Sequence, residues 1–453
     1  MPFAGFAMKI EFDPKYVDAL TLQTDEILRS ARAMPAPPPS PPRPMTNPPH
    51  PSFIFTEEHI IGEVTYFESV QDGEESENGR FWISGGNRIG WDGEAYQKIK
   101  RIASKLSTGK PLGEFISMKF AMEETFVWLR RTLEKGQDLT LAAHLKARCE
   151  ESLFQGEIWI PLNRTYANAP FTIGNVAFKA VHKNMMDAWY SRFDPVPNAE
   201  AKAVLNRERS ALQATLAACT KVCAEPQKAF EIALDRTSDA TALLRFLSHA
   251  NWSCKMRSET VPTGMEGRNS VTSLHVIDGA IKHLQKGLTE TLPRPWNVTE
   301  NIRLLPDILA RLHNLALNNA GTELRKSLYE ALLIYSRNNL TTDLSEKLLF
   351  VLVALESLLL RDGTEAIQGN LAERLAFLAG PSFDERKVIV ETTRTVYRLR
   401  SNFVHHGKAV EEVEALERFL DYAWRGLATV LTEVDKFASR GDLISYLNDR
   451  RLA

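Results

Sequence analysis

The sequence predicts an α+β protein, in which a mixed α/β N-terminal region is followed by an all-α, antiparallel helical bundle. Two patterns lead to this prediction. Residues 52–195 alternate stretches typical of half-buried strands with stretches of helical periodicity. From residue 301 onward helical periodicity is almost unbroken, and short polar or Gly-containing turns separate the helices. A chain of 453 residues has room for two or three domains.

The composition excludes several classes of protein. Hydrophobic residues make up 44% and charged residues 25%, as in ordinary globular proteins. The net charge of -2 excludes a uniformly basic nucleic-acid coat, so any contact with nucleic acid must be a local patch. Four cysteines without a Cys-x-x-Cys motif are too few for a disulfide scaffold, and they favour a reducing, cytoplasmic location.

We expect neither a targeting peptide nor a membrane segment. The N-terminal segment, residues 1–34, has no cationic start followed by a long apolar core, so a signal peptide is not expected. The longest apolar run, residues 348–360, spans 13 residues with Glu356 inside it, whereas a bilayer needs about 20. This run predicts a buried helix of a soluble protein.

A proline-rich stretch, residues 35–51, precedes the mixed region. It contains ten of the 23 prolines, so it cannot form a helix or a central strand and predicts an extended linker. A recognition tail for a proline-reading partner is the less favoured alternative.

The middle of the chain is expected to hold an α+β domain and a connector. Within residues 52–195, GEIWIPL and APFTIGNVAFKAV are typical of strands, whereas EAYQKIKRIASKL and EETFVWLRRTLEKG are typical of helices. We expect this domain to sense or target a partner that the sequence does not identify. Residues 196–300 are predicted as a helical connector, in which NAEAKAVLNRERSALQATLAACTKVC forms one helix.

Residues 301–437 are predicted as the helical bundle, and residues 438–453 as a C-terminal tail. Helix boundaries are marked by residues that favour caps and turns. The starts are predicted at Thr342 or Asp343 and at Asp384, the turns at Gly363 and Gly369, and a stop at Gly380-Pro381.

Two other motifs only weakly indicate a phosphate-binding loop and a metal site. The Gly-rich SGGNRIGWDG, residues 84–93, lacks the Lys-Ser/Thr of a P-loop and no helix is expected directly after it, so a turn between strands is favoured. Cys219 and Cys223 are four apart on the predicted connector helix and resemble half a metal site. No His or Cys pair completes it, so two buried thiols are favoured and neither a metal nor another cofactor is expected.

The stretch RLRSNFVHHG, residues 398–407, is the strongest candidate for chemistry. It reads equally as a helix C-terminus, where histidines are favoured by the dipole and Gly407 suits the left-handed position. The spacing of Arg400 and His405 proves little alone, because similar Arg–His spacings occur at Arg43–His50 and Arg268–His275.

The context of this stretch strengthens the functional reading. The helix has an apolar stripe made of Ile389, Val396, Leu399 and Phe403. Between Arg386 and Lys408 there are six basic residues and one acid, Glu391, which is a local positive patch suited to a phosphate backbone.

Residues 301–437 resemble a HEPN domain, and most closely its Apea-like branch. The resemblance is carried by ALESLLL (354–360), LAERLAFLAG (371–380) and VYRLRSNFVHHG (396–407), in that order and spacing. It implies a metal-independent endoribonuclease, commonly a toxin in antiviral or stress defence and commonly a homodimer. It also implies that Arg400 and His405 are the catalytic pair acting on RNA.

The resemblance assigns roles to these residues. His405 would exchange a proton with the RNA 2′-hydroxyl or the leaving 5′-oxygen, and Arg400 would stabilise charge on the phosphate. His406 also satisfies the spacing, so it remains an alternative base. The supporting or substrate-binding candidates are Arg398, Ser401, Asn402, His406 and Glu356.

Geometry leaves two arrangements open. On an ideal helix, Arg400 and His405 lie about 140° apart, so one intact helix does not aim both at a single phosphate. Either the helix ends near Val404, or two subunits combine their residues. Glu356 is expected to orient Arg400, to lie beside the catalytic cleft, or to form a structural ion pair. The rivals to a ribonuclease are a non-catalytic HEPN module that binds RNA or a protein, and a plain helical scaffold.

Overall fold

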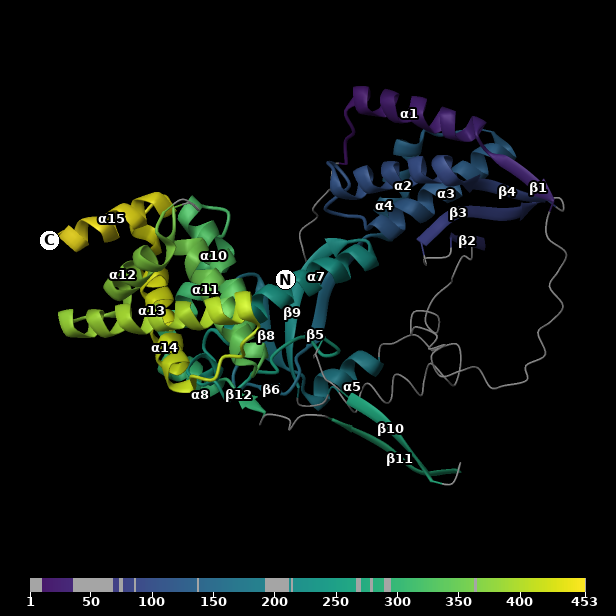
Figure 1. Cartoon of the computed structure of the whole chain (residues 1–453). Helices are drawn as coiled ribbons and strands as arrows, with labels where there is room; N and C mark the ends of the chain where they lie inside the picture. Colours follow the sequence, from purple (N-terminus) through teal and green to yellow (C-terminus); the bar gives the residue numbers. More distant parts are fainter. Residues whose placement is uncertain are drawn as a thin grey trace. The chain divides into compact units, whose positions relative to one another are not determined.

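The computed structural model divides the chain into two compact units (Figure 1). Unit 1 comprises residues 1–156, 189–211 and 222–232, and unit 2 comprises residues 157–188, 212–221 and 233–453. The residues that the structure describes are 10–35, 68–72, 76–84, 87–136, 138–191, 212, 215–265, 270–277, 280–288, 295–361 and 365–452. Within these ranges, no helix is both long and apolar enough to span a bilayer.

Up to Ser152, the described residues of unit 1 form four helices and a four-stranded sheet. The elements are α1 (Pro14–Arg29), β1 (Arg32–Pro35), β2 (Glu68–Asp72), β3 (Ser76–Ser84), β4 (Asn87–Asp92), α2 (Gly93–Thr108), α3 (Met118–Lys135) and α4 (Leu141–Ser152). The sheet is antiparallel in the order β1-β4-β3-β2. Trp91, Tyr96 and Phe126 are buried in its core, where their rings lie 5.7–5.9 Å apart.

A second sheet belongs mainly to unit 2. Its strands, in the order β5-β9-β8-β7, are β5 (Phe154–Pro161), β7 (Phe171–Ile173), β8 (Val176–Ala180) and β9 (Leu216–Ala224). The neighbouring elements are β6 (Thr165–Tyr166), α5 (Lys183–Ser191), α7 (Pro226–Arg245), β10 (Ser270–Ile277), β11 (Ala280–Leu288) and β12 (Trp296–Asn297).

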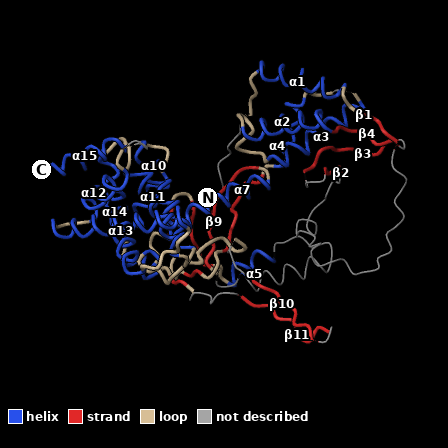
Figure 2. Tube along the Cα trace, viewed as in Figure 1, coloured by secondary structure: helices blue, strands red, loops and turns tan. Residues whose placement is uncertain are grey.

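The C-terminal part of unit 2 is helical, as predicted (Figure 2). Its helices are α8 (Thr299–Leu304), α9 (Pro306–Leu317), α10 (Glu323–Tyr335), α11 (Leu344–Leu359), α12 (Ile367–Ala379), α13 (Phe383–His406), α14 (Val413–Glu433) and α15 (Arg440–Leu452). Their buried residues form one core with Phe178 and Leu216 of the sheet and with Phe246 just after α7. This core therefore extends well before residue 301, the predicted start of the bundle.

The helix boundaries match the sequence in part. Asp343 caps α11, because its side chain accepts hydrogen bonds of 2.9 Å from the backbone N–H groups of Ser345 and Glu346. Gly380 follows the end of α12 as predicted. The start of α13 is different, because Ser382 rather than Asp384 is its N-cap. Gly369 lies inside α12 and not in the turn before it.

The prediction of a helical connector at residues 196–300 is wrong for three segments. Residues 216–224 form β9, which lies between β5 and β8, and residues 270–277 and 280–288 form the hairpin β10–β11 (Figure 1). Seven of the nine residues of β9 are buried, so the two-residue alternation typical of a strand is almost lost. A run of small residues then resembles a buried helix segment.

The predicted domain limits also change. Residues 32–35 pair with β4, so the end of segment 1–34 belongs to the sheet of unit 1. The predicted domain 52–195 divides at Gly156, since residues 157–188 belong to unit 2. Residues 36–67, which include most of the predicted linker, lie outside the described residues.

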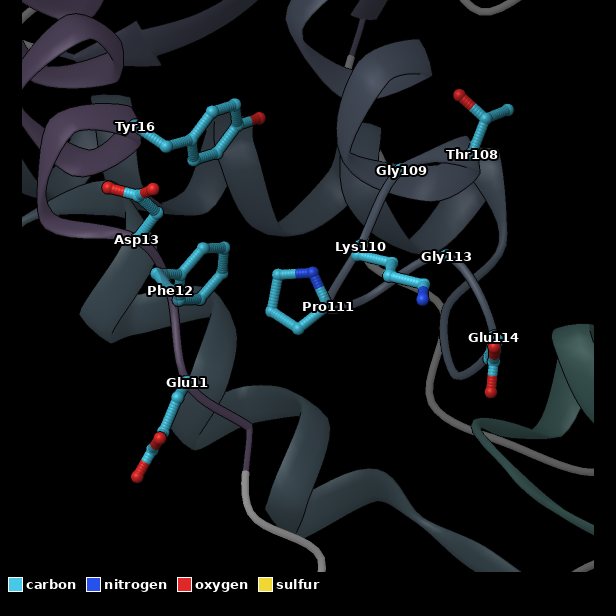
Figure 3. A pocket seen from close by; sticks show the side chains of 10 residues that line it. All are labelled: Glu11, Phe12, Asp13, Tyr16, Thr108, Gly109, Lys110, Pro111, Gly113 and Glu114. Carbon is cyan, nitrogen blue, oxygen red and sulfur yellow. The ribbon is translucent and has the colours of Figure 1, made fainter.

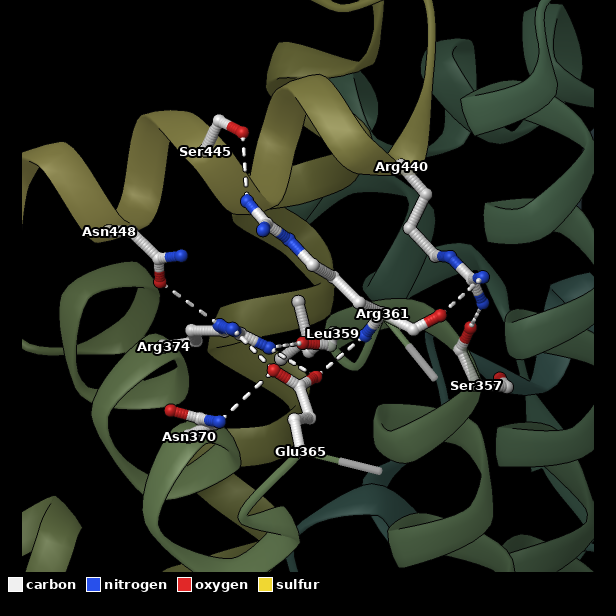
Figure 4. A network of polar contacts seen from close by, with 9 residues as sticks. All are labelled: Ser357, Leu359, Arg361, Glu365, Asn370, Arg374, Arg440, Ser445 and Asn448. Carbon is white, nitrogen blue, oxygen red and sulfur yellow. Dashed lines mark hydrogen bonds and ion pairs between the residues drawn. The ribbon is translucent and has the colours of Figure 1, made fainter. Parts of the chain in front are cut away.

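The predicted tail, residues 438–453, forms helix α15 and packs into the bundle. Leu443 and Leu447 are each 1% exposed within the bundle core. Figure 4 shows the polar network beside them, in which Arg374 of α12 donates to Asn448 Oδ1 at 3.3 Å and Arg440 donates to the Ser357 carbonyl at 2.6 Å. Helix α15 is therefore held by both apolar and polar contacts.

Candidate functional site

Helix α13 ends in a well-defined cap that fixes the candidate residues. Gly407 has φ 64° and ψ 16°, the left-handed conformation predicted for it. Its N–H donates to the Phe403 carbonyl at 2.9 Å, so the helix is intact through His406. The alternative that the helix ends near Val404 is therefore wrong.

The apolar stripe of α13 faces the core and sets the direction of Arg400. Ile389 and Val396 are fully buried, Leu399 is buried, and Phe403 is half-buried. Eleven residues separate Ile389 from Arg400, which places the two about 20° apart around an ideal helix. Arg400 thus leaves the core-facing side near the end of the helix, and it is half-buried.

His405 lies on the other side of α13. It is about 160° from Ile389 around the helix axis, and its side chain is exposed. The backbone of one chain therefore does not bring Arg400 and His405 together on the same side of α13.

Other candidates share the exposed face of His405. Arg398 precedes His405 by seven residues and lies about 20° from it around the axis, and Asn402 lies between them. Arg398 and His405 are exposed and Asn402 is half-buried. Ser401 and His406 are exposed on either side of this row. Helix α13 thus groups Arg398, Asn402 and His405 on one face, and Ser401 and His406 lie at the two edges of that face.

The positive charge of α13 is concentrated at its C-terminal half. Nearer the start, Lys387 pairs with Asp384 at 3.9 Å and Arg394 pairs with Glu391 at 2.7 Å. In the described part of the chain, no ion pair neutralises the three cations that follow, which are Arg398, Arg400 and Lys408. A phosphate would meet the least neutralised charge at the end that carries the histidines.

Glu356 contacts a residue that the sequence did not single out. It is half-buried on α11 and its Oε1 accepts a hydrogen bond of 2.7 Å from Tyr397 Oη. Among described residues no ion pair involves Glu356, so the alternative of a structural ion pair is not found and a neutral hydroxyl donates to the carboxylate instead. Burial raises the pKa of Tyr397, and the bond to Glu356 raises it further, whereas the charge of Arg400 lowers it.

The described residues of the Gly-rich motif, 84 and 87–93, form the end of β3, all of β4 and the first residue of α2, whereas the predicted turn at residues 85–86 lies outside the described residues. Ser84 pairs with Asn87, which makes β3 and β4 adjacent antiparallel strands. Helix α2 begins at Gly93, the last residue of the motif, which contradicts the expectation that no helix follows. Asp92 at that helix start pairs with Arg32 at 3.0 Å, and its carboxylate would repel a phosphate.

The two candidate metal-binding cysteines lie on strand β9 and not on a helix. Cys219 is buried, and this burial raises the pKa of its thiol to about 11, whereas Cys223 is exposed. The favoured expectation of two buried thiols is thus right for Cys219 only. The described residues contain no group of three or more His, Cys, Asp or Glu side chains suited to a metal ion.

Unit 1 contains an open hollow of about 810 Å³ that has none of the predicted site residues (Figure 3). The residues lining it are Glu11, Phe12, Asp13, Tyr16, Thr108, Gly109, Lys110, Pro111, Gly113 and Glu114. Three carboxylates and one lysine line this hollow, a balance of charge that is unfavourable for a phosphate or another anion. This hollow therefore does not extend the candidate site on α13.

No family model, curated protein or solved structure matches this chain. The assignment of residues 301–437 to the HEPN type therefore remains a prediction from the three motifs, now placed on α11, α12 and α13.

Proposed function

We propose that the chain is a metal-independent endoribonuclease of the HEPN type that cleaves RNA through the substrate 2′-hydroxyl. The observation that supports this most is the exposed C-terminal half of α13, which presents Arg398, Asn402 and His405 in one row. Its cations lack acidic partners within the described ranges, in a chain whose net charge is -2. A phosphate backbone is the anion that such a row suits.

The chemistry assigned to the pair follows from their side chains. An imidazole nitrogen can accept or donate a proton, so His405 would exchange a proton with the 2′-hydroxyl or the 5′-oxygen. The guanidinium of Arg400 donates two parallel hydrogen bonds to phosphate oxygens as negative charge develops on them. Ser401, Asn402 and Arg398 then hold the neighbouring backbone, and His406 supports the same face.

The separation of Arg400 and His405 on α13 favours a homodimer. About 140° divides them on one intact helix, so a site containing both needs Arg400 from one chain and His405 from a second. We propose that the helical region of unit 2 forms this dimer, and that the chain acts in the cytoplasm as a defence or stress toxin. The mixed α/β region would sense a trigger.

The same separation also favours a second candidate function, a non-catalytic module that binds RNA or a protein through the basic row. Such a module needs the cations for binding, but it does not need a histidine base aligned with Arg400. The variant His405→Ala distinguishes the two candidate functions. It should abolish cleavage if the chain is an enzyme, but it should barely change the RNA affinity of a binding module.

Purified full-length chain is tested on single-stranded RNA in the presence of EDTA. We expect cleavage by the wild type, a loss of at least about 10²-fold in Arg400→Ala and in His405→Ala, and a much smaller loss in His406→Ala. Circular dichroism should be unchanged in all three, because these side chains lie outside the buried core. RNA binding without cleavage by the wild type would support the binding module, and a larger loss in His406→Ala would reassign the base.

A further inference from the structure

Tyr397 lies where the core of unit 2 meets Arg400. The residue is 8% exposed and belongs to the buried core, while its hydroxyl reaches across to α11 and donates to Glu356 Oε1 at 2.7 Å. Arg400 follows Tyr397 by three residues on α13, which places the two about 60° apart and about 4.5 Å along the axis. Side chains so spaced are neighbours on a helix surface.

We propose that Tyr397 is a positioning residue for Arg400, which it serves by holding the Glu356 carboxylate beside the guanidinium. The role rests on the proposed ribonuclease function only in its consequence for cleavage. The contact itself is a property of α11 and α13, and it can be measured in the absence of any substrate.

An arginine at a helix end has many rotamers, and ordering it on a phosphate loses that entropy. A fixed negative charge on the neighbouring helix restricts the guanidinium before the phosphate binds. Because the tyrosine hydroxyl holds Oε1, Glu356 stays on α11 and does not swing toward solvent.

The strength of this restraint matters as much as its presence. A direct ion pair between Glu356 and Arg400 would occupy the donors that the phosphate needs, and none joins them among the described side chains. Tyr397 supplies the close partner of the carboxylate instead, so Arg400 keeps its donors available. Burial also raises the pKa of Tyr397, so it remains a protonated donor at neutral pH.

If the role of Tyr397 were purely structural, its hydrogen bond to Glu356 would only stabilise the packing of α11 against α13. The chain offers a matched control for it, because Tyr329 of α10 donates to Asp239 Oδ2 of α7 at the same distance, 2.7 Å. Both tyrosine–carboxylate bonds are partly buried and join two elements of unit 2. Tyr329→Phe and Tyr397→Phe should therefore lower the melting temperature by similar amounts.

The deciding measurement is the NMR signal of the Arg400 Nε–Hε group in full-length chain with labelled arginine, assigned by its loss in Arg400→Lys. In Tyr397→Phe and in Glu356→Gln we expect this signal to shift and to show greater side-chain mobility, whereas Tyr329→Phe should leave it unchanged. An Arg400 signal that is the same in wild type and Tyr397→Phe would overturn the proposal, whatever the chain does to RNA.

Cleavage provides the functional readout. Tyr397→Phe should lower kcat by about tenfold, because displacement of Arg400 is expected to slow the reaction rather than weaken the binding of substrate in the ground state. It should cause no further loss when Arg400 is already alanine. If the wild type does not cleave RNA, the proposed function fails while the NMR result still decides the positioning role. An additive loss in the double variant would contradict action through Arg400.

Discussion

Arg374 holds the Glu365 carboxylate through two parallel hydrogen bonds, each 2.8 Å long (Figure 4). The arginine is 4% exposed, and it also donates to the Leu359 carbonyl at 2.6 Å and to Asn448 Oδ1 at 3.3 Å. One side chain of α12 thereby joins the end of α11, the turn after it and α15. Arg374 belongs to the LAERLAFLAG motif, so this motif contributes the side chain that connects these elements of the helical bundle containing α13.

Removing this arginine should destabilise unit 2 strongly. Arg374→Ala leaves Glu365 and a buried carbonyl without their main donor, so we expect a loss of about 3–5 kcal/mol in the free energy of unfolding. Urea unfolding followed by circular dichroism measures it. The control is Arg394→Ala, which removes an exposed pair with Glu391 and should change stability by less than about 1 kcal/mol. Equal effects of the two substitutions would contradict the fastening role.

Gly407 is predicted to be required by backbone conformation and not by space. Its φ is 64°, and a Cβ built on it would meet nothing within 4 Å. Gly407→Ala should therefore cost about 1–2 kcal/mol, because a side chain in the left-handed region is strained. Gly369→Ala is the control, since it also meets nothing within 4 Å but lies in α12, where alanine is favoured by about 0.5–1 kcal/mol. The melting temperature should therefore fall in Gly407→Ala and rise in Gly369→Ala.

The buried amine of Lys347 should make the free energy of unfolding depend on pH above neutrality. It is 0% exposed, and this burial lowers the pKa of its amine to about 8, an effect that Cys254 opposes weakly. Its ammonium group donates to the Asn338 carbonyl at 2.9 Å. Since the ordinary pKa of a lysine is 10.5, the unfolded chain holds this proton over a pH range in which the folded chain has lost it.

The free energy of unfolding should therefore rise with pH between about 8 and about 10.5, by up to roughly 3 kcal/mol from this group. Other lysines and tyrosines titrate in the same range, so the informative quantity is the difference between wild type and Lys347→Met, measured by urea unfolding near pH 7 and near pH 10. The wild type should gain relative to the variant as pH rises. A difference that does not change with pH would contradict the lowered pKa.

A shared active site makes a quantitative prediction for mixed subunits. Arg400→Ala and His405→Ala should each be inactive alone. When equal amounts are unfolded and refolded together, half of the dimers are mixed, and each mixed dimer keeps one intact site out of two. The mixture should then recover about a quarter of the wild-type rate. No recovery, in a sample shown by light scattering to contain dimers, would contradict a site built from Arg400 of one chain and His405 of the other.

Local signals in the sequence predicted some features of α13 correctly. Its apolar spacing predicted the buried face containing Ile389 and Val396, and Gly407 predicted its end, because helical period and left-handed glycine caps depend on neighbouring residues only. Helical periodicity also indicated that Arg400 and His405 point in different directions on an intact helix.

Features that depend on tertiary contacts were not predictable in this way. Strand β9 has lost its alternation because residues on both of its faces are buried, and the sequence does not reveal this tertiary environment. The partner of Glu356 was missed for a similar reason, since Tyr397 is 41 residues away along the chain. The only local signal for it was a tyrosine one helical turn before the candidate arginine.

The chemistry of the RNA ends tests the central proposal most directly. A site that uses the 2′-hydroxyl as nucleophile must leave 2′,3′-cyclic phosphate or 3′-phosphate on the upstream fragment and cannot cleave DNA. Mass spectrometry of the products from wild-type chain in EDTA should show these ends, and they should disappear in Arg400→Ala. Fragments that end in 3′-hydroxyl, or cleavage that requires magnesium, would contradict the account.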